Sequence, residues 1–166
     1  MREREDRQQA DGGMGLAASQ APLTKVRHLL VACVGRPEPA IKLALERLRN
    51  ALPATVIVVL AAEAVPLPLV ERVWTYPVWN DAQPTRHLIK TLRSAQLEAA
   101  IILTCRHQSP YPLAYLCYLA GVPIRIGLAQ EFGGGVLTTP ISPPEDSPHH
   151  PYLDLVLAVL PSLCDH

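Results

Sequence analysis

The sequence lacks several features, and each absence narrows its class. No apolar run approaches the ~20 residues that a membrane-spanning helix needs. The opening stretch MREREDRQQADGGMG alternates in charge and lacks the apolar centre of a signal peptide. Lys and Arg total 15 and Asp and Glu total 15, so no net positive charge points to a nucleic acid as partner. We therefore expect a cytoplasmic protein with no transmembrane segment.

Cysteines and aromatic residues are few, which argues against a metal-binding protein and against a protein that stacks nucleic-acid bases. No two of the four cysteines form a Cys-x-x-Cys pair, and no histidine cluster lies at zinc-ligand spacing. We therefore expect no metal site and interpret the cysteines as small core residues in a reducing compartment. No basic stripe accompanies Trp74 or Trp79, so we interpret both as packing residues rather than as a platform for bases.

What the sequence does contain is an alternation of short apolar runs with longer amphipathic segments. Short β-branched runs are typical of buried parallel strands, and apolar residues three and four positions apart predict helices. The alternation predicts an α/β fold with a single Rossmann-like, doubly wound parallel sheet. We expect strands at residues 26–34, 55–62, 73–76, 99–104 and 124–127, and helices at residues 40–52, 85–96, 113–120 and 152–160.

Composition divides the chain into three regions. Residues 1–24 are charged and then rich in Gly, Ala, Ser and Gln, so we expect a disordered N-terminal extension. Residues 25–139 hold the predicted Rossmann-like domain. Residues 140–166 begin with a proline-rich run, which we interpret as a connector before a C-terminal helix, with His149 and His150 in a surface loop.

The loop after the first predicted strand reads Gly35-Arg36-Pro37-Glu38. In a doubly wound sheet the loops that follow the strands face one crevice, where ligands bind. A dinucleotide site would need G-x-G-x-x-G at this point, so we expect no NAD or FAD cofactor. Glu38 is either a carboxylate base held ionised by the helix dipole or a first-turn acid that only stabilises the helix.

Four polar residues follow the fourth predicted strand: Arg106, His107, Gln108 and Ser109. They are candidates for binding hydroxyls or a phosphate, with the guanidinium of Arg106 as a planar, forked donor. The alternative is a solvated loop in which Ser109 caps the next helix. The two interpretations are about equally supported. The position of these residues at the carboxyl end of a buried strand is what favours a binding role.

Two further candidates lie in and after the fifth predicted strand. Arg125 stands between two isoleucines, so it is either paired structurally or reaches over the edge of the sheet. The glycine-rich segment that follows allows close backbone approach to a ligand and an anion-binding nest, although flexible loops also use such runs. Its candidate residues are Glu131, Phe132, Gly133, Gly134 and Gly135.

The stretch HQSPYPLAYLCYLAGVPIRIGLAQEFGGGVLT, residues 107–138, resembles glycosyltransferase family 9, the ADP-heptose:lipopolysaccharide heptosyltransferase family. The resemblance rests on a helix ending in LAG, then RIG, then EFGGGVLT, then a proline-rich link and the helix YLDLVLAVL. Weaker similarity extends it to about residues 26–160. Enzymes of this family have the GT-B fold, in which two Rossmann-like domains face a cleft. This chain is similar to the N-terminal, acceptor-binding domain, and the resemblance does not extend to a donor-binding half.

The resemblance implies transfer of a sugar from a nucleotide-sugar to a lipopolysaccharide or another glycan acceptor, in an arrangement that is incomplete without a separate donor-binding domain. It implies an acceptor side lined by residues 106–109, Arg125 and residues 131–135. We expect no metal and no cofactor, as the residue spacings above indicate, and a lipid-linked acceptor would allow peripheral contact with a membrane. Family members carry Gly-Asp after the first strand, with the aspartate as base; that aspartate is missing here, and Glu38 is the nearest substitute.

The departure from the family pattern leaves two other hypotheses. One is a non-catalytic remnant that binds a glycan, a lipid-linked sugar or a protein partner. The other is a stand-alone, flavodoxin-like binder of nucleotides or phosphate, which only the three consecutive glycines support.

Overall fold

The computed structural model describes residues 26–37, 39–64, 66–76, 82–129, 134–142, 144 and 146–161. Its strands are β1 (His28–Cys33), β2 (Val56–Ala61), β3 (Arg72–Thr75), β4 (Ala99–Leu103), β5 (Ile124–Leu128) and β6 (Thr139–Ile141). Its helices are α1 (Ile41–Ala51), α2 (Ala82–Ser94), α3 (Tyr111–Leu119), α4 (Pro151–Val159) and the 3-10 turn η2 (Gly134–Val136). The predicted extension, residues 1–24, lies outside the described residues, as do Trp79 and Cys164.

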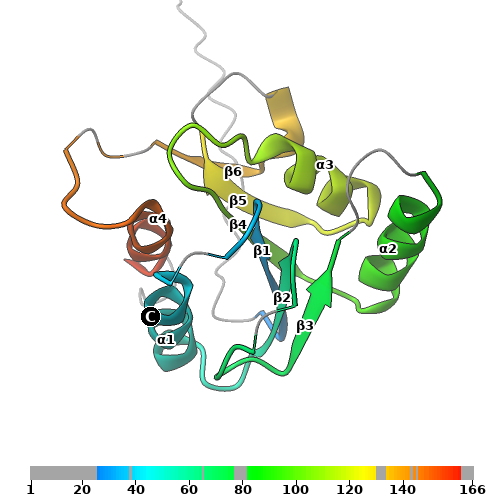
Figure 1. Ribbon diagram of the computed structural model, residues 1–166, viewed down its shortest axis with the longest axis horizontal. Coiled ribbons are helices and arrows are strands. Elements are labelled where there is room, and N and C mark those ends of the chain that lie inside the picture. Colours follow the sequence, from blue (N-terminus) through cyan, green and yellow to red (C-terminus); the bar gives the residue numbers. More distant parts are fainter. Residues whose placement is uncertain are drawn as a thin grey trace, which may run out of the picture.

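The described strands form one parallel sheet in the order β3-β2-β1-β4-β5-β6 (Figure 1). The chain builds outward from β1 to β3, returns to place β4 beside β1, and then builds outward to β6 in the opposite direction. This is the strand order of a dinucleotide-binding Rossmann sheet. The reversal between β1 and β4 is the switch point, where open α/β sheets bind ligands at their carboxyl edge.

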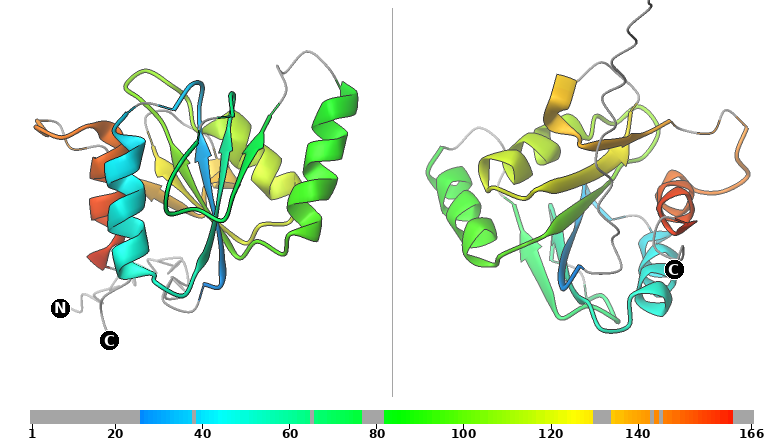
Figure 2. Two further views of the ribbon diagram at one scale, coloured as in Figure 1. Left: turned by 60° about the horizontal axis from the view of Figure 1, so that its bottom comes forward. Right: turned by 180° about the vertical axis from the view of Figure 1, so that it is seen from behind.

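Helices cover both faces of the sheet, which confirms the predicted doubly wound α/β fold (Figure 2). Along β1 the side chains alternate: Leu29 and Val31 pack on the side of α1 and α4, whereas Leu30 packs on the side of α2 and α3. Tyr152 of α4 is fully buried in the first of these two cores. The near-continuous apolar runs of β1, β2 and β4 follow from burial on both faces.

The sequence predicts five strands followed by a connector from residue 140, and this prediction is wrong at β6, which begins at Thr139. Pro140 indicated a loop because proline has no N–H to donate. However, β6 is an edge strand and Pro140 is exposed, so the missing donor leaves no gap inside the sheet. The other predicted strands and helices differ from the observed ones by at most three residues at either end.

His150, in the predicted connector, caps the N-terminus of α4. The imidazole Nδ1 of His150 accepts a hydrogen bond from the N–H of Tyr152 at 3.2 Å, which caps the start of α4. Pro151 occupies the first turn, where its missing N–H is harmless. No helix within the described ranges is long and apolar enough to cross a membrane.

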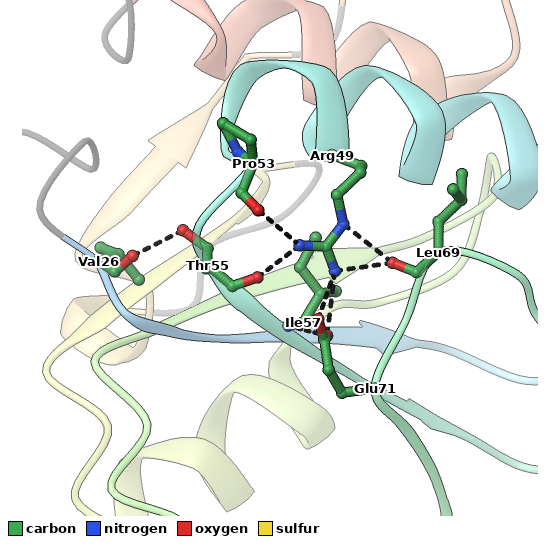
Figure 3. A network of polar contacts seen from close by, with 7 residues as sticks. All are labelled: Val26, Arg49, Pro53, Thr55, Ile57, Leu69 and Glu71. Atoms are coloured by element: carbon green, nitrogen blue, oxygen red, sulfur yellow. Dashed lines mark hydrogen bonds and ion pairs between the residues drawn. The ribbon is translucent and has the colours of Figure 1, made fainter.

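At the amino edge of the sheet, Arg49 joins α1 to the starts of two strands (Figure 3). Its guanidinium donates to the carbonyl of Thr55 at 2.6 Å, to the carbonyl of Leu69 at 2.8 and 3.2 Å, and to the carboxylate of Glu71 at 2.9 Å. The same carboxylate accepts from the N–H of Ile57 at 2.6 Å. This network lies at the opposite edge from the switch point, so its role is to hold β2 and β3 in register rather than to bind a ligand.

Candidate functional site

The chain turns sharply at Gly35, directly after β1 at the switch point. Gly35 has φ +76°, a left-handed conformation that glycine adopts without steric conflict at a Cβ. Just before the turn, the N–H of Val34 donates to the carbonyl of Leu103 at 3.0 Å. The pairing of β1 with β4 therefore continues up to the carboxyl edge of the sheet, which we call the rim. It ends at this rim, where the loop after β1 faces the loop after β4.

Tyr76 fixes this turn from two strands away. Its hydroxyl accepts from the N–H of Gly35 at 2.7 Å and donates to the carbonyl of Cys33 at 3.2 Å. Burial raises the pKa of Tyr76 above its usual value, while the bond from Gly35 acts in the other direction. The phenol is therefore neutral at physiological pH and can both donate and accept. Tyr76 is not among the predicted site residues, although it ends the third predicted strand and so shares this edge.

Gln108 brings the loop after β4 against the loop after β1. Its Oε1 accepts from the N–H of Cys105 at 2.8 Å, which fixes the orientation of the amide. Its Nε2 lies 3.4 Å from the position that a Cβ on Gly35 would occupy. Among the described residues this Nε2 has no hydrogen-bond partner. Gln108 is therefore a predicted site residue that the fold holds at the switch point with a donor to spare.

The other three polar residues of this loop bear on its two interpretations, as a binding site or as a solvated loop in which Ser109 caps the next helix. Arg106 and His107 are exposed, and His107 has φ +66°, a left-handed conformation that is uncommon for a residue with a side chain. The hydroxyl of Ser109 accepts from the N–H of Tyr111 at 3.3 Å, at the start of α3. The N-cap of α3 is nevertheless Pro110, which has no side-chain cap bond, so Ser109 holds the first N–H of the helix from the residue before the cap. Arg106 and His107 remain as polar groups that face solvent.

Thr104, directly after β4, is a further polar residue at this edge, and it is not among the predicted site residues because it ends the fourth predicted strand. Its side chain is fully buried, and its Oγ1 has no hydrogen-bond partner among the described residues. Leaving a buried hydroxyl unpaired costs about 1–3 kcal/mol. The sequence signal was a lone hydroxyl at the end of the apolar run AAIILT.

Arg125 lies elsewhere, in the amino-terminal half of β5. It is 7% exposed, and its guanidinium donates to the carbonyls of Val136 at 2.6 Å, Pro123 at 3.2 Å and Val122. It also lies over the ring of Tyr118, 5.4 Å from the centroid. These contacts match the structural alternative for Arg125, with carbonyl oxygens in place of a carboxylate, and they do not bring it to the switch point.

The glycine-rich segment is described only from Gly134 onward. Gly134 and Gly135 belong to η2, on the crossover that returns the chain from β5 to the start of β6. Gly135 is exposed and has φ −85°, so it does not use the left-handed conformation that a nest would require. Glu131, Phe132 and Gly133 lie outside the described residues, and so does Glu38.

A cleft of about 780 Å³ opens beside Tyr76, between the carboxyl ends of β2 and β3 and the first turns of α2. Its polar and aromatic lining includes Glu63, Trp74 and His87. Trp74 is half-buried and packs against the core on the side of α2, as its interpretation as a packing residue requires. The cleft extends the polar edge of the sheet from the switch point toward β3.

The fold and this edge define a Rossmann-like α/β protein whose polar loops meet at the switch point. Among solved structures, the crystal structure of the glycosyl transferase family 9 from Veillonella parvula DSM 2008 matches with a TM-score of 0.60 and 15% identity. The match covers 79% of this chain and 41% of that chain, so this chain spans less than half of the length of that protein. Identity at this level shows likeness of fold.

The other comparisons add little. The Bordetella bronchiseptica enzyme WbmG, solved in complex with NAD and UDP, matches with a TM-score of 0.38 and 16% identity, over 81% of this chain and 49% of that one. That likeness is too weak to carry an argument. No family model matches the sequence, and no curated protein matches it.

Proposed function

We propose that this chain is the acceptor-binding half of a glycosyltransferase similar to family 9, and that it works with a separate donor-binding half. The observation that carries the proposal is the likeness of fold, with a TM-score of 0.60 over 79% of this chain but only 41% of the family 9 structure. The sequence resemblance over residues 107–138 supports the same family. The acceptor is a lipopolysaccharide core or another glycan.

The switch point offers suitable chemistry for such an acceptor. Sugars and their phosphates are bound by planar amide and guanidinium donors. The spare amide N–H groups of Gln108 and the exposed guanidinium of Arg106 supply both kinds of donor within one loop. The hydroxyl of Tyr76 holds the backbone of the loop after β1 at Gly35 and Cys33. The donors of Gln108 and Arg106 therefore lie opposite a loop whose backbone is fixed by hydrogen bonds.

The reaction itself is a displacement at the anomeric carbon of the donor sugar. The acceptor oxygen forms the new bond to that carbon while the bond to the nucleotide diphosphate breaks, and a base takes the proton of the acceptor hydroxyl. The base proposed for this chain is Glu38, three residues before the start of α1 in the sequence. The negative charge that develops on the leaving diphosphate requires donors from the other half.

Saccharide binding tests the acceptor role directly. We expect inner-core oligosaccharides to bind the full chain in isothermal titration calorimetry, and Arg106→Ala and Gln108→Ala each to weaken binding by about tenfold, as the loss of one hydrogen bond to a charged ligand predicts. Arg47→Ala, an exposed change on α1, is the matched control and should leave affinity unchanged. Affinities that do not change in the two loop variants would remove this loop from the site.

A second candidate function is a glycan-binding or partner-binding module without catalysis, which the missing Gly-Asp after β1 favours. Supplying a donor-binding half together with ADP- or GDP-sugars separates the two. Sugar transfer that Glu38→Gln abolishes supports the transferase, whereas saccharide binding without transfer supports the module. Stabilisation by nucleotides alone, with no saccharide binding, would replace both with a nucleotide binder.

A further inference from the structure

The cleft beside Tyr76 is not used by the proposed acceptor site, whose donors lie in the loop after β4. It opens at the carboxyl ends of β2 and β3, and Leu88 and Thr91 of α2 line its other side. Its volume of about 780 Å³ falls within the range of sites that bind small molecules in proteins. The cleft is therefore large enough for a ligand of its own.

Hydrogen bonds join the three loops beside this cleft. The N–H of Ala62, after β2, donates to the carbonyl of Gly35 at 3.4 Å. The N–H of Tyr76, after β3, donates to the carbonyl of Ala61 at 3.1 Å, and the hydroxyl of Tyr76 accepts from the N–H of Gly35 at 2.7 Å. The loops after β1, β2 and β3 therefore hold one another in place, and this side of the cleft is formed without a ligand.

Glu63, two residues after β2, brings a carboxylate to the lining of the cleft. It pairs with Nε of Arg36 at 3.5 Å, but the two side chains are 59% and 80% exposed, so water screens this pair. An ionised carboxylate has about four acceptor positions, so Glu63 can also accept from a ligand. In Rossmann sheets an acid that follows the turn after the first strand accepts from the 2′-hydroxyl of a ribose. Glu63 has the corresponding place, because it follows the next strand after the turn at Gly35.

The rest of the lining suits a flat heterocycle. Pro84 and Leu88 contribute aliphatic surface, and Trp74 contributes part of its indole. The guanidinium of Arg72 lies 5.9 Å from the centroid of the Trp74 ring, so one face of the indole is already covered. His87 is exposed at this wall, and a neutral imidazole offers one donor and one acceptor. A nucleobase, which is apolar on its faces and polar at its edge, matches this combination.

The turn after β1 lacks the backbone donors that bind the phosphates of a nucleotide. Rossmann sites hold a pyrophosphate with the N–H groups of a glycine-rich turn at the start of the first helix. Here the N–H of Gly35 already donates to the hydroxyl of Tyr76. Pro37 and Pro39, in the same loop, have no N–H to donate. Recognition in this cleft is therefore of ribose and base and not of phosphate.

We propose that the cleft between β2, β3 and α2 binds a nucleoside. The ribose hydroxyls donate to the carboxylate of Glu63, and the base lies against the wall formed by Trp74, Pro84 and His87. The site goes beyond the proposed function, because the acceptor donors of Arg106 and Gln108 take no part in it. Either proposal can therefore fail without the other.

Isothermal titration calorimetry of the full chain tests the site, with adenosine and uridine as one probe for each class of base. We expect at least one of them to bind, and its diphosphate to bind within about threefold of the nucleoside. The matching 2′,3′-dideoxynucleoside should bind at least about tenfold more weakly, because it has no ribose hydroxyl to donate to Glu63. Glu63→Gln should weaken binding of the nucleoside by about tenfold and leave that of the dideoxynucleoside unchanged. Glu46→Gln, an exposed acid on α1 at the other side of the sheet, is the matched control and should change neither.

Four results would overturn the proposal: no binding of either nucleoside at about 1 mM, equal binding of the dideoxynucleoside, equal effects of Glu63→Gln and Glu46→Gln, or binding of the diphosphate without the nucleoside. Glucose that binds as tightly as the nucleoside and loses affinity in Glu63→Gln would assign the cleft to saccharides instead. The comparison of nucleoside with dideoxynucleoside uses the unaltered chain, so it decides the question even where a variant fails to fold. Binding of inner-core oligosaccharides should be the same in Glu63→Gln as in the unaltered chain, which keeps this test separate from that of the acceptor loop.

Discussion

Arg49 provides the sharpest test of how the sheet is held together, because one side chain joins α1, β2 and the segment before β3. We consider Arg49→Met, which keeps an unbranched apolar stem but removes every donor of the guanidinium. The change leaves the carbonyls of Thr55 and Leu69 without these donors, and among the described residues it leaves the Glu71 carboxylate with the N–H of Ile57 alone (Figure 3).

The expected loss is dominated by the carbonyl contacts rather than by the ion pair. The side chain of Glu71 is 45% exposed, so its pairing with Arg49 is screened by water and contributes at most about 1 kcal/mol. The side chain of Arg49 is only 19% exposed, and hydrogen bonds from a charged donor contribute about 1.5–3 kcal/mol. Because these contacts are not additive, we expect the free energy of unfolding to fall by about 2–3 kcal/mol.

Urea denaturation followed by circular dichroism measures this change, and the midpoint should fall while the slope m stays the same. Thermal unfolding of a chain of this size should show a Tm lower by about 4–12 °C. Arg47→Met, an exposed position on the same helix, is the matched control and should stay within about 0.5 kcal/mol of the unaltered chain. Added NaCl should change the difference between the two variants little, since carbonyl contacts are less sensitive to salt than exposed ion pairs.

An Arg49→Met variant as stable as Arg47→Met would refute this reasoning. A difference that disappears at high salt would show instead that the ion pair with Glu71, and not the carbonyls, supplies the stability. The first result would also remove the role assigned to Arg49 in holding β2 and β3 in register.

Three further predictions concern the interior. Gly127→Ala should destabilise the fold by about 1–3 kcal/mol in urea titrations, because its Cβ would lie 3.1 Å from a methyl group of Leu137; unchanged stability would mean that this side chain moves aside. Burial raises the pKa of Cys33 and of Cys117 to about 12, so both should resist alkylation of the native chain at pH 8, as peptide mapping can check. Because the unfolded thiols ionise from about pH 8.5 while the folded ones do not, the free energy of unfolding should fall as pH rises from there toward 12; constant stability over this range would contradict the assigned burial. Thr104→Val should raise the stability of the free chain by about 1 kcal/mol, since it removes a buried hydroxyl that has no partner in the described part of the chain, and a loss of stability would show that the hydroxyl has a partner.

Hydrophobic pattern was enough to predict most of the fold. Runs such as VIVVLA and AAIIL are apolar at every position, which only a strand buried on both faces requires, and the stripe of α1 repeats at helical spacing. These are local signals, so they survive in the sequence without knowledge of the neighbours. Strand β6 was not predicted because it is a three-residue strand at the edge of the sheet, and Pro140 within it is a local signal against a strand.

The candidate site was predicted less well than the fold. The position of Gln108 after β4 indicated the switch point, and the structure holds its amide there against Gly35. For Arg125 the sequence left structural pairing open, and only the family resemblance placed it on the acceptor side. Its guanidinium donates to three backbone carbonyls, and no sequence pattern predicts such contacts.

The sequence by itself determined the alternation of strands and helices, the parallel sheet and the set of polar loops, because each depends on residues close together in the chain. Only the tertiary structure decided that Tyr76 holds the turn at Gly35, that the buried hydroxyl of Thr104 has no partner among the described residues, and that Arg93 of α2 donates to the carbonyl of Leu119 in α3. These relations join residues that are far apart in sequence or depend on burial, and burial is a property of the packed chain as a whole.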